Sequence, residues 1–349
     1  MGQTGTPATH GSVHELAVAL ALDDVAYRRA VDLAGLVPDR RDWQRFLDRF
    51  LIAVGALLIV AGIAAFFAWN WADLHHMAKF ALIQGGIAAA VLIAWRLKLD
   101  SIGGRASLFA AAFLVGVLFA VFGQVYQTGA DPYGLFLVWA VLILPWAIIG
   151  RQPGLWLLFQ LLLNLTLILY WIQVLHPPDG WWQVSQLLGP LVWLATTVMD
   201  SRLASCLFAL NASAVVTWEL AANRGIAWLQ GRTYPRVLAL IALYTVLGPT
   251  VILIFGAAND HRVSIGVVSP LLFAAAVLLT LWYYQYRKLD LFMLTAALFG
   301  SILVVMSLAI RFEILAFGGA LFLALLLIGQ VAGAAVWLRS IAERRQVAG

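Results

Sequence analysis

Eleven stretches of about 20 mostly apolar residues, separated by short polar turns, constrain this chain more than any other feature. A helix needs about 20 residues to cross roughly 30 Å of hydrocarbon, so each stretch is a candidate membrane span. Only 11% of the residues are charged and the mean hydropathy is +0.92, which leaves too little polar surface to cover a water-soluble fold. The pattern predicts an all-α fold, a polytopic transmembrane helix bundle. The candidate spans are Phe50–Ala68, Met77–Trp95, Ala106–Gln124, Gly134–Gly150, Gly154–Ile172, Trp182–Met199, Leu203–Ala221, Val237–Phe255, Ser264–Tyr283, Leu291–Ile310 and Ile314–Leu338.

The distribution of Lys and Arg favours ten spans over eleven. With the amino terminus inside, eleven spans place 13 of the 22 basic residues inside and 9 outside. Removing one crossing between Arg151 and Arg224 places 18 inside and 4 outside, which fits the positive-inside rule better. The weakest candidate there is Trp182–Met199, because Gly189 and Pro190 interrupt it. We therefore expect about ten spans, with eleven as the alternative, and both termini in the cytoplasm.

The first 49 residues differ from the rest, with 6 arginines and 7 carboxylates. Ser12 and Glu15 have the spacing of a capping box, and Asp23 can cap a second short helix that ends near Gly35 and Pro38. We expect residues 1–49 to form a cytoplasmic helical tail and residues 50–345 to form the transmembrane domain. The tail is either a simple cap on the membrane surface or a docking surface for a membrane protein partner.

A polar stretch between the third and fourth spans is the first candidate site. Gln124 and Gln127 are three residues apart and share a helix face, Tyr126 lies between them, and Asp131 could reach the same region. These side chains could bind a small molecule or a lipid headgroup on the outer face. The alternative is an ordinary helix end, at which the glutamines bond to free carbonyl groups.

Glu219 is the second candidate, because it lies in an otherwise apolar run. Carboxylates inside spans are costly and often functional. Alternatively, Glu219 lies near the membrane interface and pairs with Arg224, five residues further on.

The sequence offers little for cofactors, metals or catalysis. It contains no phosphate-binding loop, no His-Glu-x-x-His and no Gly-x-Ser-x-Gly. His75 and His76 are adjacent and are expected to point in different directions, and the single cysteine, Cys206, excludes a multi-cysteine site. The basic residues are scattered and do not form a stripe, which argues against nucleic-acid binding. We expect no cofactor, no metal and no catalytic residue, and we favour a protein that is not an enzyme.

The front of the chain resembles a bacterial family of predicted membrane proteins, domain of unknown function 2157, over roughly residues 15–150. The family has no established activity, so the resemblance implies a location in the bacterial inner membrane and no site residues. Residues 151–345 would add further spans. The residues that carry the resemblance are Leu33–Val37, Ile52–Gly62, Ala68–Trp71, Gly123–Ala130 and Trp139–Ala140.

Together these features predict an integral membrane protein that binds or transports a small molecule or a lipid headgroup. The alternative is a non-catalytic accessory or scaffold subunit that holds a partner through residues 1–49. Under both hypotheses the helices contact the lipid bilayer.

Overall fold

The computed structural model describes residues 22–34, 74–126, 131–175, 200–255, 267–312 and 319–347, together with isolated positions between 13 and 20 and between 43 and 58. It divides into two units, Met1–Lys79 and Phe80–Gly349. All regular structure in the described residues is helical. The all-α prediction is therefore confirmed, whereas the expected domain boundary at residue 49 stays a prediction.

The first unit contains the short helix α2, Asp24–Leu33. Asp23 caps it as predicted, because its side chain accepts a hydrogen bond of 2.7 Å from the backbone N–H of Ala26. The expected capping box at Ser12 and Glu15 lies outside the described residues, as does most of the predicted span Phe50–Ala68.

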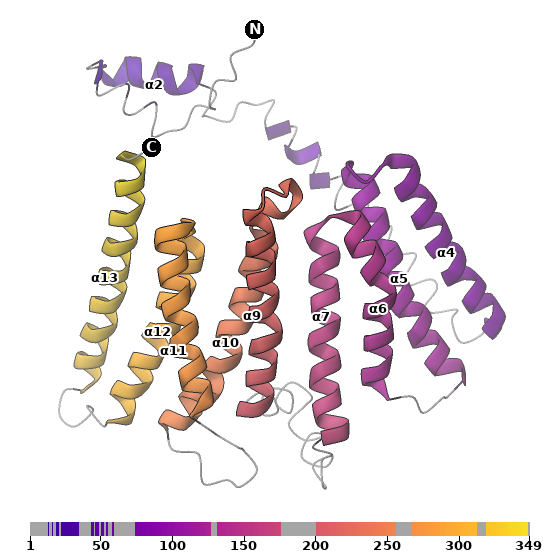
Figure 1. Ribbon diagram of the computed structural model, residues 1–349. Coiled ribbons are helices and arrows are strands. Elements are labelled where there is room, and N and C mark those ends of the chain that lie inside the picture. The colour runs from indigo at the N-terminus through magenta and orange to yellow at the C-terminus, as the bar shows by residue number, and fades with distance from the viewer. Residues whose placement is uncertain are drawn as a thin grey trace. The chain divides into compact units, whose positions relative to one another are not determined.

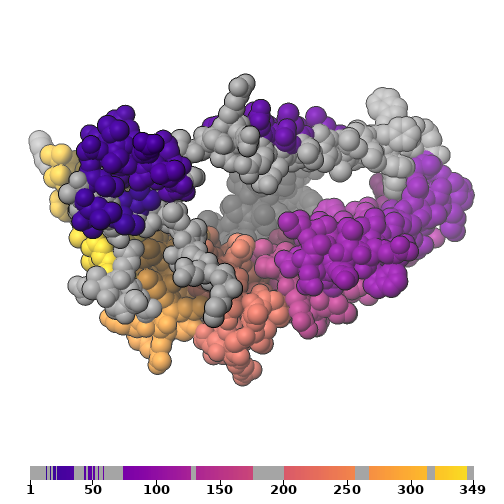
Figure 2. Space-filling view, turned by 90° about the horizontal axis from the view of Figure 1, so that it is seen from above, coloured from indigo at the N-terminus to yellow at the C-terminus, as the bar shows by residue number. Residues whose placement is uncertain are grey.

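Nine helices in the described residues are long and apolar enough to cross a membrane, and each overlaps one predicted span. Figure 1 shows those beyond Lys79 running up and down next to one another. Seen from above, α4–α7 (the front group, purple to magenta) lie on one side and α9–α13 (the rear group, salmon to yellow) on the other (Figure 2). The helices are α4 (His76–Leu97), α5 (Ile102–Tyr126), α6 (Pro132–Gly150), α7 (Pro153–Tyr170, continued by η1, Trp171–Leu175), α9 (Ser201–Asn223), α10 (Thr233–Ile254), α11 (Val268–Trp282, continued by η4, Tyr283–Arg287), α12 (Leu291–Arg311) and α13 (Gly319–Val347), and the short helix η2 (Ala227–Gln230) precedes α10.

Helices α7 and α9 are antiparallel, which bears on the number of spans. The rings of Trp156 and Trp218 lie 6.3 Å apart, and further along α7 Asn164 bonds to Asn211, which is earlier in α9. The end of α7 and the start of α9 therefore lie at the same end of the helices, as Figure 1 also shows. The ten-span prediction, in which Trp182–Met199 does not cross the membrane, requires this arrangement. Trp182–Met199 and most of Phe50–Ala68 lie outside the described residues, so the count itself stays a prediction.

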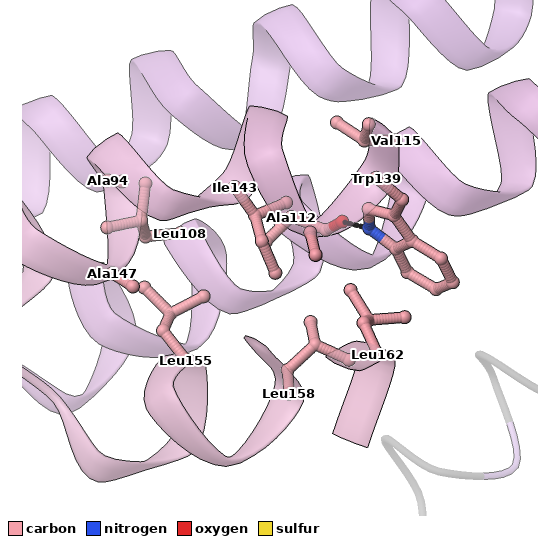
Figure 3. Packing of buried hydrophobic residues seen from close by; sticks show 11 residues of the cluster. Ala94, Leu108, Ala112, Val115, Trp139, Ile143, Ala147, Leu155, Leu158 and Leu162 are labelled. Carbon is pink, nitrogen blue, oxygen red and sulfur yellow. Dashed lines mark hydrogen bonds between the residues drawn. The ribbon is translucent and has the colours of Figure 1, made fainter. Parts of the chain in front are cut away.

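The front group packs around Trp139 of α6 (Figure 3). Its indole Nε1 donates a hydrogen bond of 2.8 Å to the Ala112 carbonyl of α5, so the one polar atom of this buried ring is satisfied. Gly116 makes this approach possible, because a Cβ there would lie 2.3 Å from the Trp139 ring. Ile143 and Leu155 extend the same buried cluster towards α7.

Amide side chains join the two groups inside the apolar layer. Asn164 and Asn211 exchange hydrogen bonds of 2.7 and 3.1 Å, and Gln160 donates to the Asn211 side chain at 3.2 Å. All three residues are buried. They form the interhelical hydrogen bonds that explain isolated amides in membrane spans, and no ligand is needed to account for them.

Candidate functional site

Basic side chains gather at one end of the helices, which we call the basic end. It is the end at which α4, α6, α9 and α11 finish and α5, α7, α10 and α12 begin, and it is the upper end in Figure 1. Charge there, next to apolar helices, marks a membrane–water interface. The described basic residues in or beside these turns are Arg96, Lys98, Arg105, Arg151, Arg224, Arg232, Arg236, Arg287 and Lys288.

Glu219, in the last turn of α9, is the centre of an ion-pair network at the basic end. Its carboxylate lies 2.6 Å from Arg232 Nη1 and 3.0 Å from Lys288 Nζ. The Tyr284 hydroxyl donates a third hydrogen bond to it at 2.9 Å. Only 6% of the Glu219 side chain is exposed, so these partners replace the water that the carboxylate has lost.

Asp290 is the second carboxylate of this network. It accepts hydrogen bonds from Arg232 Nε at 2.8 Å and from Arg236 Nε and Nη2 at 3.1 Å, and it also caps α12 by accepting from the backbone N–H of Phe292. Arg232 Nη2 lies 2.8 Å from the same carboxylate in an ion pair whose angle is too poor for a hydrogen bond. Burial alone would raise the pKa of Asp290, but the hydrogen bonds from Arg236 and Arg232 outweigh it and hold that pKa below its usual value.

Arg232 joins the two carboxylates. Burial lowers its pKa, but the hydrogen bond to Asp290 and the charge of Glu219 more than compensate, so the pKa is raised and the guanidinium stays charged. It also lies 5.3 Å from the centre of the Tyr284 ring, a cation–π contact. We call these residues the charged cluster; it carries three cations and two carboxylates, and its members are Glu219, Arg232, Arg236, Tyr284, Lys288 and Asp290.

An apolar cavity of about 140 Å³, the rear cavity, lies between α9, α10, α11 and α12. The rear cavity is close to the charged cluster. Three of its lining residues each lie three positions, about one helical turn, from a cluster member. Those residues are Val216 for Glu219, Ala239 for Arg236 and Met293 for Asp290. Apolar space in the hydrocarbon layer thus ends next to charge at the interface.

A more polar pocket of about 480 Å³, the rear pocket, lies beside Lys288 at the end of α9 and η4. Its other lining residues are Asn223, Trp282, Tyr283 and Arg287, so it has two cations and no carboxylate in its lining. The Arg287 guanidinium lies 5.9 Å from the centre of the Trp282 ring, and Asn223 Nδ2 donates to the Tyr283 hydroxyl at 3.0 Å. Lys288 lines this pocket and also pairs with Glu219, so it connects the pocket to the charged cluster.

The polar residues predicted as a site between α5 and α6 do not lie near Glu219. Gln124 and Tyr126 lie at the finish of α5 and Glu219 at the finish of α9, and these two helices run in opposite directions. Both Gln124 and Tyr126 are exposed, and the Tyr126 ring stacks on Phe80 at 6.0 Å. Asp131 is exposed at the start of α6, and its side chain makes no capping bond. Gln127 lies outside the described residues, and a ligand site at this end stays a prediction.

Glu219 is buried and paired, but its partners differ from the one suggested by the sequence. Arg232, Lys288 and Tyr284 contact it, whereas Arg224 is the exposed cap residue after α9. Sequence reasoning missed these partners because they are 13 to 69 positions away. The one sequence signal for these partners was that the turns on one side of the membrane carry most of the basic residues.

His75 and His76 require a correction. They do not point apart, because their ring centres lie 3.9 Å from each other. His75 precedes α4 and accepts a hydrogen bond from the Met77 N–H, so its ring is not directed by helical geometry. In the part of the chain that the structure describes, no group of three or more His, Cys, Asp or Glu residues is placed to hold a metal ion.

Apolar helices of spanning length, with basic residues gathered at one end, define a polytopic integral membrane protein. Residues 19–156 match the model of a family described as a predicted membrane protein (DUF2157), which confirms the resemblance of the front of the chain. The matched part includes α2, α4, α5 and α6. No curated protein and no solved structure matches the chain.

Proposed function

We propose that this integral membrane protein binds an anionic membrane lipid at the basic end of the rear group. The observation that carries the proposal is that the rear pocket and the rear cavity follow one another along the same two helices. Leu279 and Thr280 of α11 line the cavity, and Trp282 and Arg287 further along line the pocket. On α9 the cavity-lining Val216 likewise precedes the pocket-lining Asn223.

The chemistry of the two spaces fits the two ends of a lipid. Arg and Lys bind phosphate oxygens through charge-assisted hydrogen bonds, and Arg287 and Lys288 are available in the rear pocket. Trp282 and Tyr283 are residue types that favour the headgroup level. The rear cavity is lined almost entirely by apolar side chains and would take part of an acyl chain.

The bilayer orientation belongs to the same proposal. The positive-inside rule places the basic end, and with it the lipid headgroup, on the cytoplasmic side of a bacterial inner membrane. With the predicted span Phe50–Ala68 ahead of α4, both chain termini then lie in the cytoplasm. Glu219 moderates binding, because it competes with a lipid phosphate for Lys288.

The test is native mass spectrometry of the full chain in a mild detergent, titrated with phosphatidylglycerol or phosphatidylcholine. We expect phosphatidylglycerol to bind more tightly than phosphatidylcholine. The double variant R287Q/K288Q should weaken phosphatidylglycerol binding by about tenfold or more. The matched control is R311Q, which neutralises an exposed arginine at the opposite end of α12. Equal binding of the two lipids, or equal loss in R287Q/K288Q and R311Q, contradicts the proposal.

A second candidate is the accessory role of residues 1–49. It is favoured by two apolar side chains of α2, Val25 and Leu33, which are 74% and 84% exposed. The test is purification from native membranes of the full chain and of a variant lacking residues 1–45. A stoichiometric protein partner that is lost with the deletion supports docking, and identical composition of the two preparations argues against it.

A further inference from the structure

Two adjoining cavities open at the basic end of the helices, one along the front group and the other between the front group and η2, whose Ala227 and Trp228 line it. One, the front groove, has a volume of about 550 Å³ and is mainly apolar, with Val91, Trp95 and Trp146 in its lining. The other, the front pocket, has a volume of about 500 Å³ and is more polar. Leu99 and Ile149 line both, so the groove leads directly into the pocket.

The front pocket contains charges of both signs. Arg105 from the start of α5 and Arg151 from the turn after α6 line it together with Asp100, a carboxylate in the turn before α5. The rear pocket, by contrast, has no carboxylate in its lining. The two pockets are therefore suited to different headgroups.

The turn that carries Asp100 is held firmly in place. The Ser101 hydroxyl donates to the Lys98 carbonyl at 2.9 Å and accepts from the Gly104 N–H at 3.0 Å. Arg105 Nε donates to the Leu99 carbonyl at 3.0 Å, which fixes the guanidinium at the pocket. A site held by such bonds is organised before a ligand arrives.

Backbone strain is concentrated around the same two cavities. Among the described residues, Lys98 with φ of 62° and Arg151 with φ of 47° are the non-glycine residues with positive φ. Lys98 lines the front groove and Arg151 lines the front pocket. Left-handed conformations are costly for side chains of this kind and collect at ligand sites.

We propose that the front groove and front pocket form a second lipid site, selective for a phospholipid whose headgroup carries a phosphate and a primary ammonium group. The two guanidinium groups bind the phosphate, Asp100 accepts hydrogen bonds from the ammonium group, and the groove takes an acyl chain. A quaternary ammonium group has no N–H to donate to Asp100. The site shares no residue with the rear pocket, so the two proposals stand or fall separately.

The experiment is native mass spectrometry of the full chain, titrated with phosphatidylethanolamine, phosphatidylcholine and phosphatidylglycerol of the same acyl composition. We expect R151Q to weaken phosphatidylethanolamine binding by about tenfold, the effect of losing one charge-assisted contact. The matched control is R311Q, which neutralises an exposed arginine at the opposite end of the helices and should leave this binding unchanged. Binding of phosphatidylethanolamine that survives R151Q, or that R311Q weakens as much, overturns the proposal.

A second variant tests selectivity rather than folding. D100N should remove the preference for phosphatidylethanolamine over phosphatidylcholine while phosphatidylglycerol binding is retained, which general loss of structure would not produce. An unchanged preference in D100N overturns the assignment of Asp100. Soluble glycerophosphoethanolamine distinguishes the source of the headgroup: weak competition supports a lipid held partly by its chain, and competition as strong as that of the lipid overturns the role of the groove.

Discussion

Neutralising Glu219 is the sharpest test of the charged cluster. In E219Q the side chain keeps its length and one carbonyl oxygen, but it loses the negative charge that faces Arg232 and Lys288. The new amide NH₂ group would also point towards cations, with which it cannot form a hydrogen bond. The substitution therefore removes the electrostatic compensation at the centre of the cluster while leaving its packing nearly unchanged.

The structure sets the size of the effect. Removing one partner of a fully buried ion pair costs about 3–5 kcal/mol, because the remaining charge is left uncompensated. Here the cost is smaller, since Arg232 keeps Asp290 and the Lys288 side chain is 27% exposed and can turn to water. We expect E219Q to reduce the free energy of unfolding by about 2–3 kcal/mol, close to the loss of one or two charge-assisted hydrogen bonds.

Thermal unfolding in detergent, followed through the 15 tryptophans, measures the effect. The matched control is E343Q, which breaks the Arg339–Glu343 pair, whose side chains are 81% and 59% exposed. Water screens that pair, so E343Q should stay within a few tenths of a kcal/mol of the natural protein. If E219Q and E343Q unfold at the same temperature, Glu219 is not held as the structure indicates and the reasoning about the cluster is wrong.

Three further substitutions test other parts of the fold through the same measurement. The pKa of Asp290 is lower in the folded state, so the ionised carboxylate stabilises the protein at pH values above its usual pKa of 3.8, and this contribution is lost as the pH falls through the folded-state pKa. The difference in unfolding midpoint between the natural protein and D290N should therefore be full at pH 7 and should shrink in acid. A difference that grows in acid contradicts this sign. G116A places a methyl group against the buried Trp139 ring and should cost about 1–3 kcal/mol, whereas a neutral result means that the ring has room to move. N211A removes the donor to the Asn164 side-chain oxygen and should cost about 1 kcal/mol, less than E219Q. A larger loss than that of E219Q would show that the amides rather than the charges dominate.

The spans were predictable because their signal is local. A run of about 20 apolar residues is sufficient to define a membrane helix, and each described span, such as α5 or α12, overlaps its predicted window. The cap of α2 by Asp23 was predictable for the same reason, since the capping bond joins residues three positions apart. Helix ends were less accurate: α5 begins at Ile102, whereas the apolar run begins at Ala106, because the helix continues beyond the hydrocarbon layer.

The pairing of charges was not predictable, because it depends on which turns meet in space. Glu219 and Asp290 are both carboxylates at helix ends, yet nothing in their local sequence indicates that they share Arg232. Arg224 was predicted as the partner of Glu219 because spacing along the chain reveals only neighbours on the same helix. The apolar spans determine that the helices cross the membrane, and only the packing of α9, α10 and α12 determines which turns become adjacent.

This packing gives Arg232 a role that distance in sequence conceals. Arg232 lies in the turn between α9 and α10, and Asp290 lies in the turn between α11 and α12, so their ion pair joins two separate helical hairpins at the basic end. Glu219 and Lys288 make a second connection between the same hairpins. The rear cavity lies between these four helices, and its lining begins about one helical turn from both connections. A phosphate that draws Lys288 away from Glu219 would loosen one connection, while Arg232 and Asp290 keep the other. Lys288 is half-buried and contacts one carboxylate through a single nitrogen, so it is the cation that a ligand can most easily draw away from the cluster. Asp290, held by two arginines and by the start of α12, is the fixed point of the cluster.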